Sequence, residues 1–171
     1  MNPINSKAAY WLQKGLFDDL KSFADFESRV NVVFEEKDRG DLFEIFIEGY
    51  IATQAITQRV KHWVVGNIPL DIRERYNLPN DGTGIDGIYE THDGSHVAYQ
   101  VKYRQNHNLT FAEVAPFLGI TEKFLDRVIF TNATALSHKA VVRTRWYSGD
   151  AFNSLSEDQL KQIEAWLKEK P

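Results

Sequence analysis

Apolar residues recur every three or four positions in several stretches of the 171-residue chain, which is the spacing of one helix face. The segment 40–54, GDLFEIFIEGYIATQ, carries a continuous apolar stripe of this kind, and Asp41 followed by Glu44 predicts its capped start. At 156–170, SEDQLKQIEAWLKEK predicts an amphipathic helix capped by Ser156. A shorter stripe in the first forty residues also predicts helix, through Leu12, Leu16, Leu20 and Phe23.

The middle of the chain has the shorter apolar runs that are typical of β-strands. GIDGIYE at 84–90 and SHVAYQVKY at 95–103 are rich in Ile, Val and Tyr, and the Asp93-Gly94 pair between them predicts a hairpin. The remaining predicted elements are a strand within 61–70, a polar loop at 71–83, a helix opened by a capping box at Thr110 and Glu113, a strand at 127–133 and a helix at 137–144.

This order of helices and strands predicts a mixed α/β fold, in which helices flank a central mixed β-sheet. No repeat, linker or low-complexity tract interrupts the chain, so we expect a single domain over residues 1–171. Within it we expect an N-terminal helical part (1–38), a core (39–145) and a C-terminal helix (150–171).

Composition narrows the classes of function. The chain has no cysteine, which excludes disulfides, thiolate zinc sites and cysteine nucleophiles and favours a cytoplasmic location. No apolar run reaches the ~20 residues of a membrane-spanning helix, so no membrane partner is expected. The net charge is −4, but residues 102–145 hold seven basic and three acidic side chains, a local +4 that leaves −8 elsewhere. This split permits a polyanionic partner on one face, although a solvated surface explains it as simply.

Three polar residues of the predicted hairpin, Asp86, Gln100 and Lys102, form a candidate site. Gln100 and Lys102 are two residues apart, so they lie on one face of their strand. If the turn has the three loop residues His92–Gly94, Asp86 lies directly opposite Gln100 on the same face. A two-residue turn would instead pair Asp86 with Val101 and scatter the site. We expect the three-residue turn.

A second carboxylate is expected from the helix at 40–54. Glu44 lies at the edge of its apolar stripe, where it can reach over the rim of the sheet toward the hairpin. Glu48 is expected further round, toward solvent, so Glu44 is the better candidate. Glu44 also suits a purely structural role as a capping carboxylate, and the two roles are compatible.

Together these side chains have the chemistry of a magnesium site. Because Mg²⁺ prefers hard oxygen ligands and keeps several waters, Asp86, the Gln100 side-chain oxygen, the Val101 carbonyl and Glu44 would suffice to hold it. The ion, or Mn²⁺ in its place, lowers the pKa of a bound water and neutralises charge on a phosphate, and Lys102 would orient that water. The set predicts phosphodiester hydrolysis. The structural alternative for Gln100 is an internal hydrogen bond in the core.

The motifs GIDGIY and AYQVKYR resemble the PD-(D/E)xK nuclease superfamily in its D…QxK form, and most of all its Mrr-like restriction endonuclease domains. RGDLFEIFIEGYI is similar to the first-helix motif of these domains and would place Glu44 at its acidic position. The resemblance spans about residues 39–143. It implies a restriction-endonuclease-like core, 5′-phosphate and 3′-hydroxyl products, and work as a dimer or beside a helicase in a larger restriction enzyme. Ile85 and Gln100 depart from the pattern, which has proline and an acidic ligand there.

We therefore expect a metal-dependent nuclease domain that cuts DNA. One alternative is a catalytically silent domain of the same fold that binds nucleic acid or protein, and another is a structure-specific junction resolvase. Arg104, Gln105 and His107 follow the catalytic strand and are candidate contacts to nucleic acid, although a solvated loop explains them equally. The histidines of the chain have no zinc-ligand spacing.

Overall fold

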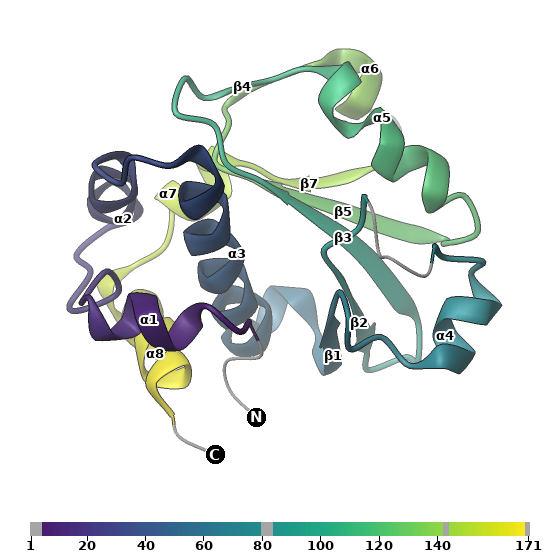
Figure 1. Cartoon of the computed structure of the whole chain (residues 1–171), viewed down its shortest axis with the longest axis horizontal. Helices are drawn as coiled ribbons and strands as arrows, with labels where there is room; N and C mark the ends of the chain where they lie inside the picture. The colour runs from purple at the N-terminus through teal and green to yellow at the C-terminus, as the bar shows by residue number, and fades with distance from the viewer. Residues whose placement is uncertain (1–4, 80–83, 142–143, 170–171) are drawn as a thin grey trace. The chain divides into compact units, whose positions relative to one another are not determined.

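The computed structural model divides the chain into two compact units (Figure 1). The first joins Met1–Thr57 to Gly149–Pro171, and the second is Gln58–Ser148. Residues 39–57, which the sequence assigns to the core, therefore group with the first unit. The residues that the structure describes are 5–79, 84–141 and 144–169.

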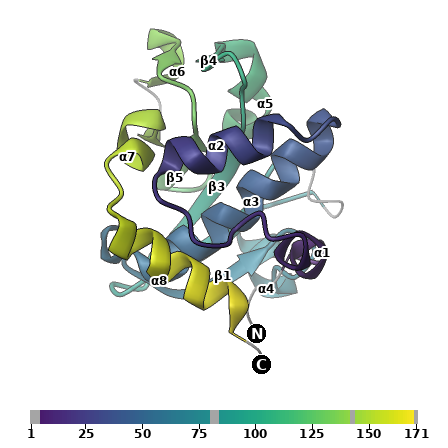
Figure 2. The same ribbon diagram turned by 90° about the vertical axis from the view of Figure 1, so that its left-hand side faces the viewer.

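The first unit is helical and is built from both ends of the chain. Its elements are α1 (Ala8–Gln13), α2 (Phe23–Asn31), α3 (Glu36–Thr53), a 3-10 turn η1 (Ala55–Thr57), α7 (Gly149–Asn153) and α8 (Glu157–Lys168). Figure 2 shows α8, in yellow, lying among the helices of the N-terminal segment. In the core the Phe26 and Phe46 rings stack at 4.7 Å, and Phe152 meets Phe46 edge-on. The close approach of α3 to α8 requires Gly49, since a Cβ there would lie 2.8 Å from Ile163.

Two helix starts in this unit test the predicted caps. The prediction for α3 is wrong, because the helix begins at Glu36 and Asp41 is an interior residue. Asp41 instead accepts hydrogen bonds from Lys7 and Lys37, which explains a carboxylate in the second turn of the helix. The prediction for α8 is confirmed, with the reciprocal bonds of the Ser156–Gln159 capping box in place.

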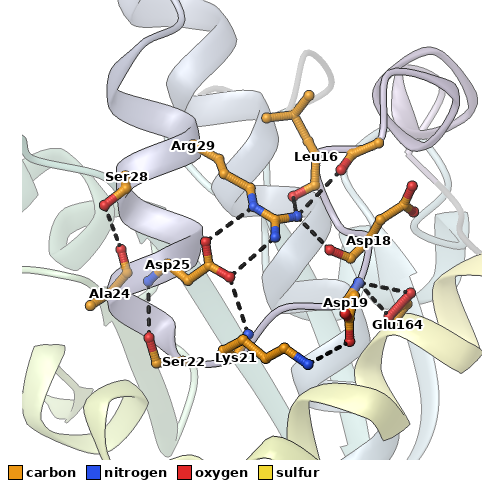
Figure 3. Close-up of polar contacts among 11 residues, drawn as sticks. Leu16, Asp18, Asp19, Lys21, Ser22, Ala24, Asp25, Ser28, Arg29 and Glu164 are labelled. Atoms are coloured by element: carbon orange, nitrogen blue, oxygen red, sulfur yellow. Dashed lines mark hydrogen bonds and ion pairs between the residues drawn. The ribbon is translucent and has the colours of Figure 1, made fainter.

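The stripe predicted as one helix in the first forty residues is broken between α1 and α2. Gly15 and Asp19 have φ values of +79° and +50°, which no α-helix accommodates. Arg29 of α2 holds this segment, because it bonds the Asp25 carboxylate and also donates to backbone carbonyls of the segment, the shortest at 2.6 Å (Figure 3). Glu164 of α8 accepts from the Asp19 N–H at 3.1 Å.

The second unit is a mixed α/β structure built on a sheet. Its elements are β1 (Arg59–Val64), α4 (Leu70–Arg75), β2 (Gly87–Thr91), β3 (His96–Lys102), β4 (Asn108–Leu109), α5 (Phe111–Ile120), β5 (Asp126–Thr131), β6 (Ala135–Leu136), α6 (His138–Val141) and β7 (Arg145–Tyr147). Within the described residues the sheet has five strands in the order β1-β2-β3-β5-β7, antiparallel from β1 to β3 and parallel from β3 to β7. The predicted fold class, mixed α/β with a mixed sheet, is confirmed. No helix in the described ranges is long and apolar enough to cross a membrane.

The two faces of this sheet carry different side chains. On one face Ile88, Ala98 and Ile129 join an apolar cluster with Ile72 of α4 and Phe117 of α5. On the other face a row of aromatic rings crosses the strands, with neighbouring centroids 5.0 to 6.2 Å apart, formed by Tyr89, Tyr99, Phe130 and Tyr147. Because the first face is covered by this apolar cluster, a polar side chain that is buried there must be stabilised by contacts within the protein and not by water.

The helix α4 was not predicted. Residues 71–83 are polar enough to predict a loop, but Ile72 and Leu78 are buried in the apolar cluster, and this burial holds the helix on the sheet. Residues 80–83 of the predicted loop and 142–143 of the predicted helix at 137–144 lie outside the described residues.

The β2–β3 hairpin has the predicted three-residue turn. The Thr91 N–H donates to the Ser95 carbonyl at 3.0 Å, which leaves His92–Gly94 as the loop. Gly94 has a φ of +84°, the left-handed conformation that this turn requires and that glycine adopts without strain. Asp93 Oδ1 accepts from the Ser95 N–H at 2.9 Å and closes the turn.

Candidate active site

Asp86 and Gln100 face each other across the β2–β3 hairpin. Gly87 pairs with Tyr99, so the register places Asp86, one residue earlier, opposite Gln100. The backbone of Asp86 is fixed on both sides, since its N–H donates to the Tyr99 carbonyl at 3.0 Å and its own carbonyl accepts from the Val65 N–H at 2.9 Å. The expected register is confirmed, and both side chains lie on one face of the sheet.

The Asp86 carboxylate is held by the backbone of β3. Its Oδ2 accepts a hydrogen bond from the Val101 N–H at 2.7 Å. In a strand the N–H and C=O of one residue point to the same side, so Tyr99 and Val101 both turn their backbone groups toward β2. The Val101 carbonyl therefore lies on the same side of β3 as the carboxylate.

Gln100 is buried, and its side chain is satisfied at one end. Its Nε2 donates to the Gly84 carbonyl at 3.1 Å, while its Oε1 is buried with no hydrogen-bond partner among the described residues. A buried acceptor left without a donor costs about 1–3 kcal/mol. The internal hydrogen bond explains the amide nitrogen, and the orphaned oxygen fits the donor set of a hard cation such as Mg²⁺.

Lys102 ends β3 on the same face as Gln100. The side chain is half-buried, and its ammonium makes no hydrogen bond or ion pair with any residue that the structure describes. Lys102 pairs with Thr131 in the last register position of the β3–β5 ladder. One hairpin face thus presents a carboxylate, an amide oxygen and an ammonium in succession.

The helix acid belongs to the other unit. Glu44 is half-buried on α3, in the first unit, and its part in the site stays a prediction. The prediction that Glu48 faces solvent is wrong, because only 2% of it is exposed. Within the described ranges no group of three or more His, Cys, Asp or Glu side chains could hold a metal. Besides Asp86, the candidate ligands on the hairpin are neutral oxygens, from Gln100 and Val101.

The three candidate nucleic-acid contacts after Lys102 differ in burial and in their bonding partners. Arg104 is half-buried and forms an ion pair with Glu113 at 2.7 Å, whereas Gln105 is exposed. His107 has a φ of +57°, and its carbonyl accepts from two N–H groups of the segment after β5 at 3.0 and 3.1 Å. The sequence did not predict a role for Asn132, whose side chain bonds the Arg104 backbone. The only signal was an asparagine directly after a buried strand.

Comparison with known proteins decides the family. A model of the Mrr_cat_2 family, described as a restriction endonuclease, matches residues 53–165. The chain belongs to this restriction endonuclease family. The match confirms the resemblance to Mrr-like domains; it contains Asp86, Gln100 and Lys102 and begins after Glu44. Neither a curated protein nor a solved structure matched the chain.

A restriction endonuclease domain is a nuclease, and the family implies DNA as substrate. Its active sites belong to the PD-(D/E)xK type, which generally uses divalent metal ions. The residues of the hairpin agree with that chemistry in kind, since each candidate ligand is an oxygen atom.

Proposed function

We propose that the chain is a Mg²⁺-dependent deoxyribonuclease domain that hydrolyses phosphodiester bonds. The observation that carries the proposal is the buried Gln100 Oε1, which lies opposite Asp86 and has no hydrogen-bond partner in the described part of the chain. Lys102 supports it, because this half-buried residue lies on the same face, two positions after Gln100, and an ammonium there is suited to a phosphate.

Each residue has one role in this proposal. Asp86, the Gln100 side-chain oxygen and the Val101 carbonyl would hold the ion, Mg²⁺ or Mn²⁺, and Glu44 would complete the set. When bound, the ion lowers the pKa of a water and neutralises charge on the phosphate. Lys102 orients the attacking water and stabilises the same charge. The water oxygen bonds to phosphorus as the bond to the 3′-oxygen breaks, which leaves 5′-phosphate and 3′-hydroxyl ends.

The proposal extends to partners. Gln105 and His107 would contact the nucleic acid next to the catalytic strand. The domain would serve a cytoplasmic restriction or DNA-processing system, beside a helicase on the same or another chain or as a homodimer.

Replacement of Asp86 by asparagine tests the proposed function. Asparagine keeps an oxygen that can accept from the Val101 N–H, so the hairpin is retained, but it removes the negative charge that a divalent ion needs. We expect plasmid cleavage in Mg²⁺ or Mn²⁺ to fall by about 100-fold or more, and the same for Lys102→Met. Nicking and linearisation are measured on gels, with EDTA as a blank.

Two matched variants control for charge loss alone. Asp158→Asn and Lys161→Met change exposed residues of α8 and should leave cleavage unchanged. Cleavage that persists in both site variants would contradict the assigned residues. DNA binding by a parent protein that never cuts would favour the silent module, and preferential cutting of a four-way junction would favour the resolvase.

A further inference from the structure

The end of β3, directly after Lys102, is held by a buried side chain. Asn132 is 1% exposed, and its Oδ1 accepts from the Arg104 N–H at 2.7 Å while its Nδ2 donates to the Arg104 carbonyl at 2.8 Å. A carboxamide carries the same donor and acceptor as a peptide group. The side chain therefore binds the Arg104 backbone as a neighbouring strand would.

This contact replaces a strand that has turned away. The β3–β5 ladder ends at the pair of Lys102 and Thr131. Directly afterwards the Thr131 hydroxyl accepts from the Ala133 N–H at 3.1 Å, which bends the backbone after β5. Alternate residues of β3 turn their backbone groups toward β5, and Arg104 is next in that series. Without Asn132 its N–H and carbonyl would lose these partners.

The Arg104 side chain anchors the same point to α5. Its Nε and Nη2 both approach Glu113 Oε1 at 2.7 Å, and its Nη1 donates to the Tyr103 carbonyl at 2.8 Å. The other carboxylate oxygen, Glu113 Oε2, accepts from the Thr110 N–H at 2.7 Å in the predicted capping box. Each nitrogen of the guanidinium thus already has an acceptor within the protein.

The charge of Glu113 agrees with this arrangement. Partial burial acts to raise its pKa, but hydrogen bonds from Thr110 and the Arg104 guanidinium outweigh burial and lower the pKa below its ordinary value of 4.5. The carboxylate is therefore ionised at neutral pH, and the pair with Arg104 is a charge-assisted one.

We propose that Arg104 and Asn132 are positioning residues, which hold the exit of β3 and thereby keep the Lys102 ammonium in place for the reaction. The inference rests on the proposed nuclease function. It assigns Arg104 an internal role in place of a phosphate contact. The two residues act through the backbone, so neither needs to touch DNA.

The substitution Arg104→Met separates the two roles of that residue. A positioning role predicts that kcat falls by about 10- to 100-fold with KM unchanged, because a small misplacement of a reacting group is costly. The salt dependence of DNA binding, measured with Ca²⁺ in place of Mg²⁺, should also stay the same. A phosphate contact would instead weaken binding and reduce the salt slope by about one, which would overturn the inference. Lys123→Met, on an exposed loop, is the control.

Asn132 is tested in the metal-free protein by amide hydrogen exchange. In Asn132→Ala the Arg104 amide should exchange at least about 10-fold faster, while the Val101 amide, bonded to Asp86, should not change. If that variant does not fold, Asn132→Asp keeps the acceptor but sets an oxygen against the Arg104 carbonyl, and kcat should fall about 10-fold with Arg104 still protected.

The outcomes distinguish the two proposals. Cleavage by the parent together with parental kcat in both the Arg104 and Asn132 variants would overturn the positioning role alone. Unchanged exchange at Arg104 in Asn132→Ala would do the same without reference to activity. A parent that binds Mg²⁺ and DNA but cuts neither strand would overturn the proposed function, and the positioning role with it.

Discussion

At the scale of single residues, the candidate ligands on the hairpin combine one carboxylate with neutral oxygens. Gln100 stands where the family has an acid, and Glu90, the other acidic side chain of this described hairpin face, pairs with His96 at the far end of the ladder and contacts it at 3.3 Å. A low ligand charge implies weak binding of a divalent ion in the absence of substrate. The phosphate of DNA would then supply the missing negative charge.

The substitution Gln100→Glu tests this balance. Glutamate loses the amide that donates to the Gly84 carbonyl, so the metal-free protein should lose about 1–3 kcal/mol of stability. The added charge should strengthen Mg²⁺ binding, and Mg²⁺ should raise the melting temperature more than it does for the parent. Differential scanning fluorimetry with and without Mg²⁺ measures both effects. Equal Mg²⁺ responses in parent and variant would exclude Gln100 as a ligand; Gln13→Glu, exposed on α1, is the control.

The sequence predicted some of these residues and could not predict others. The pairing of Asp86 with Gln100 followed from a local turn signal. The burial of Glu48 did not, because an apolar stripe defines a solvent face only where one side of the helix is buried, and α3 is buried on most sides. Asn132 bonds Arg104, 28 positions away, and such contacts leave no periodic pattern.

At the scale of elements, the hairpin turn determines whether the site exists at all. Its register depends on Gly94, whose φ of +84° strains any residue with a side chain. Nothing lies within 4 Å of a Cβ built there, so the cost of Gly94→Ala is conformational, and we expect a loss of about 1 kcal/mol. Gly40→Ala, in α3 with equal space, should stabilise by about 0.5–1 kcal/mol. Urea denaturation compares the two; a gain for both would contradict the role of the turn.

Elements with strong local signals were predicted well. The turn of the hairpin and the capping boxes of α5 and α8 each depend on residues that are close together in the sequence. The start of α3 was missed because Asp41 has a partner in Lys7, the residue before α1. The helix α4 was missed because most of its residues are polar, and Ile72 is its one buried residue.

At the scale of the whole molecule, folding is coupled to the protonation of one histidine. Burial, together with the charge of Arg59, lowers the pKa of His62 from 6.5 to about 3. The neutral ring forms a 2.7 Å hydrogen bond between its Nε2 and Tyr99 Oη. The unfolded chain takes up a proton at His62 below pH 6.5, whereas the folded chain does not until about pH 3, so stability falls as the pH drops through that window.

We expect the loss between pH 7 and pH 4 to be about 2–3 kcal/mol, less than the full shift implies because part of the His62 residue is exposed to solvent. The variant His62→Gln keeps polar atoms for Tyr99 but does not titrate. Between pH 7 and pH 4 its free energy of unfolding should therefore fall by about 2–3 kcal/mol less than that of the parent. Urea midpoints at several pH values measure the difference. Identical pH profiles for the two proteins would contradict the neutral, buried state of His62.

The division into two units was beyond the reach of the sequence. No change of composition marks residue 57 or 149, where the chain passes between units. The first unit is assembled from two distant segments, and the apolar pattern of each does not indicate which other segment it packs against. The fold class follows from the order of elements, but that grouping depends on long-range packing.

The discontinuous first unit has a consequence for the order of events during synthesis. The bond from Asp19 to Glu164 joins residues 145 positions apart, and α3 packs on α8, so this unit lacks part of its core until translation nears residue 168. The second unit is continuous and is complete on the ribosome first. Until then, Phe26 and Phe46 of the nascent N-terminal helices are incompletely covered. Exposed apolar surface of this kind is what chaperones bind.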